Sequence, residues 1–585
     1  MKEIKWLITT IKGYKKFIFT GWGISIVCAM LAMAFPYLFA TLIKEVIEEG
    51  NKDRLFPILA SMLLVIVAKV SVRYGMQRIL EFASQNVFKR IRDQIYKKLQ
   101  DLDFSFFDRH GTGELMAKIV GDTDVIRNFI SAATSMILEN VLFFVFAFII
   151  ISTINWQLML ILLTVSPVIG IVTYKFSKKI KPVFVQIREQ YSKLNSVVEE
   201  NISGNRVVKA YTREAFEIEK FDHENDEYMR INIEATKTNA RFAPILDGLS
   251  SSMIFIFLIS GGTFLYLGKI QMWEFVAINS YLWAIIGPMR MSSNLINELQ
   301  RFYIAAIRIM EVLRAEPLIE NSKNAIFHDV EGVVEFKSVS FGYPGEKTTL
   351  KNISFKANKG EVIAIVGPTG SGKTTLAALI SRFYDVDEGE VLVDDINVKD
   401  YNIQNLRSKI GIAMQDVFLF SETIEGNIAF GVPDISFDEV VAAAKIAGAD
   451  GFINKMPEGY DTIVGERGVG LSGGQRQRLS LARAICKKPS ILILDDTTSA
   501  VDMETEREIQ RALNGVLKDK TAFIIAHRIS SVKHADQILV LEDGVITERG
   551  THQELLAKKG YYYSIFETQS GTYDDRIEGQ VVNHG

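Results

Sequence analysis

The chain has few cysteines and almost no net charge. Its 585 residues include 2 Cys, and the formal net charge is −3. A nearly neutral chain lacks the strong basic surface that nucleic-acid binding requires, so we expect no nucleic-acid partner. Cys28 lies in an apolar run and Cys486 beside a lysine pair, which excludes a disulfide framework and a cysteine-rich metal site. The N-terminus also lacks the pattern of a cleaved signal peptide.

Length and hydropathy predict two different halves. A chain of 585 residues is too long for a single hydrophobic core, so two or more domains are expected. Hydrophobic residues make up 48% of the chain and are concentrated in long runs of the N-terminal half. From about Val330 the sequence is typical of a soluble α/β protein.

Six runs of the N-terminal half approach or exceed the length of about 20 mostly apolar residues that a membrane helix needs. Short connections alternate with two very long ones, so one face of the membrane receives only hairpin turns. The six predicted spans are residues 17–43, 55–74, 135–154, 156–174, 249–267 and 273–289.

Positive charges predict the orientation of these spans. The two long connections and the N-terminus are rich in lysine and arginine, which places them in the cytosol. We therefore expect a multi-pass protein of the cytoplasmic (inner) membrane with both termini cytosolic. Buried core helices of a large soluble protein are the alternative, and Lys69, Arg73, Glu139 and Asp247 favour it. The number of runs and their agreement on orientation favour the membrane.

The long connections have a helical pattern, so the spans should continue into the cytosol as rods. Residues 104–126 and 199–221 each contain a glycine-bearing break between helical stretches. Such a break predicts a short turn helix at the tip of a hairpin, where it can dock into another domain.

A phosphate-binding loop begins the chemistry of the C-terminal half. The segment EVIAIV reads as a buried strand and leads directly into GPTGSGKTT, which fits the spacing G-x-x-x-x-G-K-[ST]. Glycines let backbone N–H groups surround phosphate oxygens, while the lysine reaches the outer phosphates and the threonine binds magnesium. The predicted ATP-binding residues are Gly367, Pro368, Thr369, Gly370, Ser371, Gly372, Lys373, Thr374 and Thr375.

Further motifs follow in a diagnostic order. They are MQDVFLF with Gln415, LSGGQRQ from Leu471, the strand ILILD, SAVD at 499–502 and IIAHR with His527. This order resembles the ATP-binding cassette (ABC) transporters, and with the six spans the whole chain resembles a bacterial ABC exporter half-transporter of the multidrug type. The resemblance implies an α-helical six-span transmembrane domain fused to an α/β P-loop NTPase domain. We expect a transmembrane domain at 1–315, a linker at 316–332, a nucleotide-binding domain at 333–570 and a tail at 571–585.

The resemblance implies a role for each motif. Tyr343 matches an aromatic residue that stacks on adenine, although by itself it could equally be a strand-edge tyrosine. Gln415 and Asp495 match residues that serve Mg²⁺ together with Thr374, and His527 matches the switch histidine that contacts the γ-phosphate.

The signature residues Ser472, Gly473, Gly474 and Gln475 match a segment that closes on ATP held by the opposite subunit. An isolated SGGQ could equally be a helix N-cap. The loop with Glu466 and Arg467 matches one that lies near the hairpin tips.

The second acid of ILILDD departs from the family pattern. Asp496 stands where the family usually has a catalytic glutamate, so its carboxylate is one methylene short. A general base must lie within about 2.6–3.2 Å of its proton, and a misplacement of ~1 Å can cost about 10²-fold in rate. We expect this site to hold ATP and hydrolyse it slowly.

Two partnerships are compatible with this departure. Either the chain forms a homodimer with two slow sites, or it pairs with a different half-transporter that carries Glu at the matching position. The heterodimer is favoured because the other motifs are intact. The predicted function is ATP-driven export of amphipathic or hydrophobic compounds, drugs or lipids, by alternating access with ATP and Mg²⁺. A homodimeric lipid flippase or a nucleotide-gated regulator with slow hydrolysis is the alternative.

Overall fold

The computed structural model divides the chain into two compact units. One comprises residues 1–100 and 112–315, and the other comprises residues 101–111 and 316–585. Residue 6 and residues 9–569 are described, except for 346, 433, 466, 467, 469, 498–502 and 518. The first unit ends at residue 315, and the sequence predicts the end of the transmembrane domain at the same residue. Residues 101–111 group with the C-terminal unit, whereas the sequence predicts them in the transmembrane domain.

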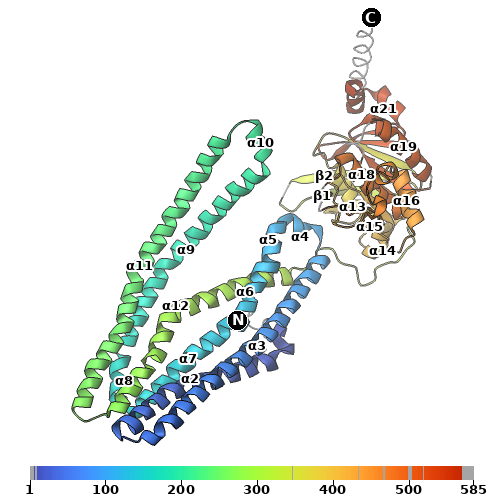
Figure 1. Cartoon of the computed structure of the whole chain (residues 1–585). Coiled ribbons are helices and arrows are strands. Elements are labelled where there is room, and N and C mark those ends of the chain that lie inside the picture. The colour runs from blue at the N-terminus through green and yellow to red at the C-terminus, as the bar shows by residue number, and fades with distance from the viewer. Residues whose placement is uncertain are drawn as a thin grey trace. The chain divides into compact units, whose positions relative to one another are not determined.

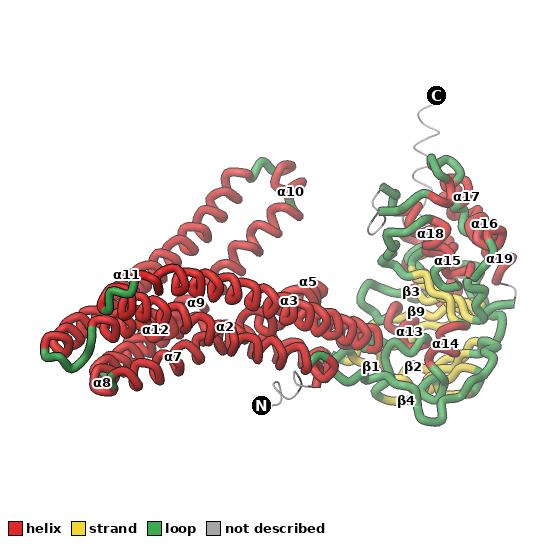
Figure 2. The backbone as a smooth tube through the Cα atoms, turned by 60° about the horizontal axis from the view of Figure 1, so that its bottom comes forward, coloured by secondary structure: helices red, strands yellow, loops and turns green. Residues whose placement is uncertain are grey.

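Long helices build the N-terminal unit (Figures 1 and 2). α3 alone has 47 residues and is therefore about 70 Å long at 1.5 Å per residue. Helices of this length exceed a bilayer, which confirms that the spans continue as rods. The helices are α2 (Lys15–Leu42), α3 (Leu55–Asp101), α5 (Thr112–Ala117), α6 (Thr123–Asn128), α7 (Thr134–Ile154), α8 (Trp156–Leu163), α9 (Val165–Ser203), α10 (Asn205–Ala210), α11 (Glu214–Tyr266) and α12 (Met272–Arg314), with π-helical turns at Ile43–Glu48, Lys118–Asp122 and Phe129–Ala133.

Five helical stretches of the described residues are long and apolar enough to cross a membrane. They contain the first four predicted spans and all but the last residue of the fifth, because α11 ends at Tyr266. The sixth predicted span, residues 273–289, lies within α12, which is not among the five. Its buried face includes Ala277, Ile278 and Tyr281, and the Tyr281 hydroxyl donates to the Met33 carbonyl at 2.8 Å. A helix that packs among other helices needs fewer apolar residues than one that faces lipid.

Two ion pairs join charged residues within or beside the predicted spans. Arg73 on α3 lies 3.9 Å from Glu139 on α7, and Arg290 on α12 lies 3.4 Å from Asp247 on α11. Ionisable groups at membrane depth are costly unless they are paired or hydrated. The pairs therefore remove most of the objection that these residues raised against membrane spans.

Both hairpin tips contain the predicted short helix. α4 (Phe104–Arg109) and α10 (Asn205–Ala210) each have six residues. α9 and α11 run side by side and carry α10 at their joined end (Figure 1). Gly204 separates α9 from α10, as the glycine-bearing break in the sequence predicted.

Two sheets form the C-terminal unit. The larger sheet has the order β10-β9-β3-β8-β7-β6, in which all neighbours are parallel except the edge strand β10. The smaller sheet is antiparallel, with the order β2-β1-β4-β5. The strands are β1 (Val334–Gly342), β2 (Thr348–Ala357), β3 (Val362–Val366), β4 (Glu388–Val393), β5 (Ile396–Asn397), β6 (Ile410–Ala413), β7 (Ile491–Asp495), β8 (Thr521–Ile525), β9 (Gln537–Glu542) and β10 (Val545–Gly550).

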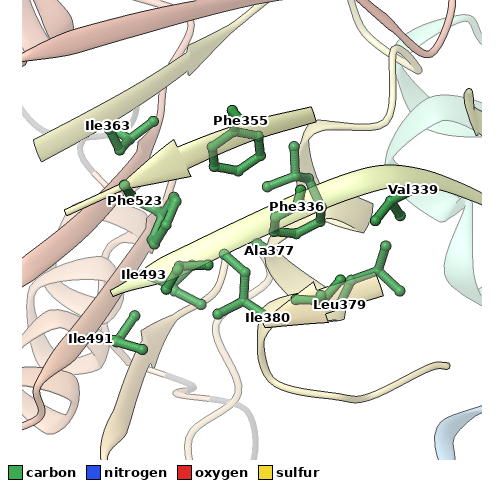
Figure 3. Packing of buried hydrophobic residues seen from close by; sticks show 14 of the residues in the cluster. Phe336, Val339, Phe355, Ile363, Ala377, Leu379, Ile380, Ile491, Ile493 and Phe523 are labelled. Carbon is green, nitrogen blue, oxygen red and sulfur yellow. The ribbon is translucent and has the colours of Figure 1, made fainter. Parts of the chain in front are cut away.

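One hydrophobic core lies between the two sheets and α13 (Lys373–Ile380). Figure 3 shows Phe336 and Phe355 of the smaller sheet near Phe523 of the larger one. The rings of Phe336 and Phe355 stack with centroids 4.7 Å apart, which adds to the stabilisation from their burial. β3 and β7 are almost wholly buried, as their continuous apolar sequences predicted.

The tip helix α4 packs on the C-terminal unit to which it belongs. Phe104 lies with its ring centroid 4.5 Å from that of Phe383, and the Tyr384 hydroxyl donates to Asp108 at 2.8 Å. Asp103 caps the helix by accepting from the Phe106 amide at 3.3 Å. These contacts explain why residues 101–111 group with the C-terminal unit.

We predict that cysteines at positions 104 and 383 can be joined by a short reagent with two thiol-reactive maleimide groups, each of which adds to one thiol. Phe104→Cys with Phe383→Cys should give a linked peptide pair by mass spectrometry, because the two rings are in contact. Each single variant is the control, since the native Cys28 and Cys486 are both buried. A folded double variant that yields no linked pair would remove the docking of α4.

Candidate functional site

Parallel register brings three of the motifs to one edge of the large sheet. Ile365 of β3 pairs with Ile525 of β8, and Ile525 pairs with Asp495 of β7. The phosphate loop follows β3, His527 follows β8 and Asp496 follows β7, so all three begin at the same level. Ligands bind at such carboxyl edges of parallel sheets.

Two glycines of the phosphate loop have no room for a side chain. A Cβ at Gly367 would lie 2.0 Å from the Leu541 carbonyl oxygen, and one at Gly372 would lie 2.6 Å from Leu350 Cδ2. Gly372 also has φ +100° where it caps α13. At Gly370 φ is +82°, but no atom would lie within 4 Å of an added Cβ. The loop therefore depends on glycine for different reasons at different positions.

The Lys373 side chain lies inside the phosphate loop and donates to its backbone. Its side chain is buried, with 7% of the residue exposed, and Nζ donates to the carbonyls of Gly367 at 3.0 Å and Pro368 at 2.8 Å. Burial lowers the pKa of the Lys373 ammonium, and the nearby carboxylates Asp495 and Asp496 oppose that shift. An anion beside this group would stabilise its charged form.

The loop also holds an unsatisfied hydroxyl. Ser371 is buried, and its Oγ has no hydrogen-bond partner among the described residues. A buried polar atom without a partner costs about 1–3 kcal/mol. A phosphate oxygen in the loop would satisfy it, so the residues present fit a bound nucleotide.

Thr374 and Asp495 form the direct link between the phosphate loop and β7. The Thr374 hydroxyl donates to Asp495 Oδ2 at 2.8 Å. Burial raises the pKa of Asp495, the Thr374 hydrogen bond opposes that shift, and the neighbouring Asp496 charge adds to it. A hydroxyl and a carboxylate are oxygen ligands of the kind that Mg²⁺ prefers, so this pair fits the ion.

Asp496 has its backbone fixed on two sides. Its φ is +48°, its amide donates to the Ile525 carbonyl at 2.9 Å, and its carbonyl accepts from Gln477 Nε2 at 3.2 Å. Gln477 was not among the predicted site residues, although it is the last residue of the quoted LSGGQRQ. It connects the helix that follows the signature with the second acid.

The signature serine is a helix N-cap. Ser472 caps α18 (Gly473–Cys486) and forms a capping box with Gln475, in which the Ser472 amide donates to Gln475 Oε1 at 2.8 Å. Among the contacts of the described residues, none joins Ser472–Gln475 to the phosphate loop. The simpler interpretation of SGGQ is thus correct for the local structure, and it is compatible with a role toward another subunit.

The remaining predicted residues lie around this edge. The Tyr343 hydroxyl lies 3.1 Å from Thr375 Oγ1, which puts the ring beside the loop helix at the end of β1. Gln415 is exposed and follows β6, and His527 is exposed and follows β8. Glu466, Arg467 and the SAVD segment at 499–502 lie outside the described residues.

Comparison with known proteins agrees with the two-part architecture. Residues 18–289 match the family described as ABC transporter transmembrane region, and residues 350–499 match the family described as ABC transporter. A putative multidrug export ATP-binding/permease protein of Bacillus subtilis is 34% identical over 97% of this chain and 100% of its own length. The chain belongs to the ABC exporter family. Membership of this family explains both the order of its motifs and its transmembrane region.

Two further similarities support this assignment. An ATP-dependent lipid A-core flippase of Syntrophus aciditrophicus is 34% identical over 94% of this chain and 92% of its own length. The solved structure of a bacterial Atm1-family ABC exporter with ATP bound has a TM-score of 0.83 and 25% identity, over 95% of this chain and 99% of that one. The exporter is thus a membrane-spanning half-transporter that binds ATP, works as a dimer and couples ATP hydrolysis to transport.

The loop glycines should differ in their tolerance of alanine. Gly367→Ala should lower the free energy of unfolding by about 2–5 kcal/mol, because the methyl group meets the Leu541 backbone in a strained conformation. Gly370→Ala carries only the strain of its positive φ, about 1–2 kcal/mol. Thermal unfolding of the two variants measures the difference, and equal losses would contradict the loop geometry.

Lysine 373 should be needed for nucleotide affinity. Lys373→Ala removes a charged hydrogen-bond donor, so binding of a fluorescent ATP analogue at this chain's site should weaken roughly 10- to 100-fold. Lys359→Ala is the matched control, since that lysine is exposed and pairs with Glu331 at 3.1 Å. Unchanged affinity in Lys373→Ala would contradict the assignment.

Proposed function

We propose that this half-transporter exports amphipathic or hydrophobic compounds across the cytoplasmic membrane, as one half of a heterodimer with one slow ATP site. Both termini are then cytosolic. One observation carries the proposal. The phosphate loop, Asp495 and His527 lie at one sheet edge, and Thr374 of the loop donates to Asp495, whereas the second acid is Asp496 where the family usually has Glu.

Thr374 and Asp495, with Gln415 from the loop after β6, are the proposed holders of Mg²⁺. The phosphate loop with Lys373 would bind the phosphates of ATP, and Tyr343 would lie against the base. When bound, the ion would neutralise phosphate charge and favour the ionised form of Asp495, whose pKa burial raises. The hydrogen bonds of Lys373 and the unsatisfied buried hydroxyl of Ser371 support this assignment.

The backbone at Asp496 supports slow hydrolysis at this site. Two hydrogen bonds hold the peptide groups of Asp496, from its amide to Ile525 and from Gln477 to its carbonyl. The backbone therefore cannot easily advance to compensate for the missing methylene. The carboxylate therefore stays about one bond length short of the position that a glutamate carboxylate would reach. This distance weakens general-base action without changing the groups that bind ATP.

The tip at α10 supports a dimer. Ile202, Val207 and Tyr211 are 73%, 61% and 76% exposed. Apolar side chains at the end of a cytosolic hairpin have no lipid to cover them, so a protein surface is the expected cover. We propose that the partner's nucleotide-binding domain covers this tip.

The names of the relatives bear on the cargo. One relative is named a putative multidrug export protein and another a lipid A-core flippase, and both align over nearly the full chain. Both names fit amphipathic cargo. The flippase name also fits a second candidate function, a homodimeric lipid flippase with slow hydrolysis.

Unequal effects of two substitutions test the heterodimer. Asp496→Asn should leave most of the steady-state ATPase of the purified pair, because the working carboxylate belongs to the partner. Gly474→Asp should abolish most of it, because the signature of this chain closes over the partner's ATP.

A matched pair of capping residues separates the signature from helix stability. Ser472 and Ser436 both form capping boxes, on α18 and on α16 (Phe437–Ile446). Either change to Ala should cost about 1 kcal/mol of stability, but only Ser472→Ala should reduce turnover strongly. Full, cooperative turnover by this chain alone, lost in Asp496→Asn, would refute the heterodimer and show that Asp496 is a working base.

A further inference from the structure

The loop that carries His527 is held by two side chains that belong to none of the ATP-binding motifs. Gln569, in the helix at residues 561–569, donates from Nε2 to the His527 carbonyl at 2.8 Å. Its Oε1 accepts from the Ile529 amide at 2.9 Å. One amide group thus bridges the peptide groups on both sides of Arg528.

The second side chain is Glu506 of α19 (Met503–Leu517). Only 4% of this residue is exposed, and its carboxylate accepts from Arg528 Nη1 at 2.8 Å and from Ser531 Oγ at 2.6 Å. Ser530 donates to the same carboxylate at 3.4 Å. A buried carboxylate with several partners is rigid, so Glu506 fixes the side of the loop that faces α19.

Apolar packing fixes the helix that carries Gln569. Tyr562 is fully buried, and it packs with Ile565 and Phe566 in a cluster that includes Ile529 and Val532 of α20 (Ile529–Val532). The Tyr562 hydroxyl also lies 2.7 Å from His552 Nδ1. The helix at 561–569 is therefore anchored independently of the two hydrogen bonds that Gln569 makes.

We propose that Gln569 and Glu506 are positioning residues that hold His527 in place for the γ-phosphate of ATP. The inference rests on the proposed function of His527. The imidazole itself is exposed, so its own contacts do little to fix it, and its place depends on the backbone of residues 527–531. Glu506 holds that backbone through Arg528 and Ser531, and Gln569 holds it through the peptide groups.

The test compares ATPγS with ADP, because only the former has a γ-phosphate group. In the purified full chain, Gln569→Ala should lower the ratio of ATPγS affinity to ADP affinity at least threefold, with ADP affinity unchanged. Gln569→Glu keeps the acceptor for the Ile529 amide and loses the donor to His527, so it should give an intermediate ratio. Deuterium uptake at residues 527–531 should rise in Gln569→Ala.

Further variants separate positioning from stability. Glu506→Gln should lower the same ratio, whereas Glu508→Gln, an exposed site on the same helix, and Thr568→Ala, the neighbour of Gln569, should not. His527→Ala should lower the ratio at least as far as Gln569→Ala. Adding Gln569→Ala to His527→Ala should then cause no further loss, because both act through one imidazole.

Each failure has its own meaning. If His527→Ala lowers the ratio and Gln569→Ala does not, the positioning role is refuted and the proposed function stands. If His527→Ala leaves the ratio unchanged, the proposed role of His527 is refuted, and positioning toward the γ-phosphate with it. Equal losses of ATPγS and ADP affinity in Gln569→Ala would show a purely structural effect and also refute the inference.

Discussion

The register of the parallel strands β3, β8 and β7 is the constraint on which the candidate site depends. Ile365, Ile525 and Asp495 lie level across the three strands, so each strand releases its loop at the same edge. A slip of one residue would turn every side chain of a strand to the opposite face. Because β3 and β7 are buried on both faces, the close packing of their side chains resists that slip, and the position of the site follows from the core beneath it.

Local patterns made much of this architecture predictable. The buried strands, the phosphate loop and the two short tip helices all follow from periodicity or glycine placement within about ten residues. The place of residues 101–111 could not be predicted in the same way, because it depends on a contact between Phe104 and Phe383 across the sequence. No sequence pattern predicts the hydrogen bonds of Gln477 and Gln569, because they too join residues that are far apart in the sequence. For most proposed ligand residues, the sequence shows a resemblance to the motifs of a known family, and the structure shows that the residues lie near one another.

The backbone conformation at position 496 gives a second reason for aspartate there. Its φ of +48° lies in the left-handed region, where aspartate and asparagine are several-fold enriched over other non-glycine residues. A longer acid at this position extends further toward the reacting atoms, but it is less suited to the conformation. Aspartate relieves conformational strain there and gives up reach. The residue that looks defective for chemistry is thus well suited to its turn.

The grouping of residues 101–111 with the C-terminal unit has a consequence for synthesis on the ribosome. About 200 residues separate this segment from the rest of its unit. Phe383 follows the end of α4 by about 270 residues, so at translation rates of about 5–20 residues per second α4 waits roughly 14–55 s for the surface on which it packs. A fragment that begins at residue 316 lacks α4 altogether and leaves the Phe383 ring without its aromatic neighbour. The nucleotide-binding domain is therefore not a continuous module of the chain, and its completion requires a membrane hairpin made long before it.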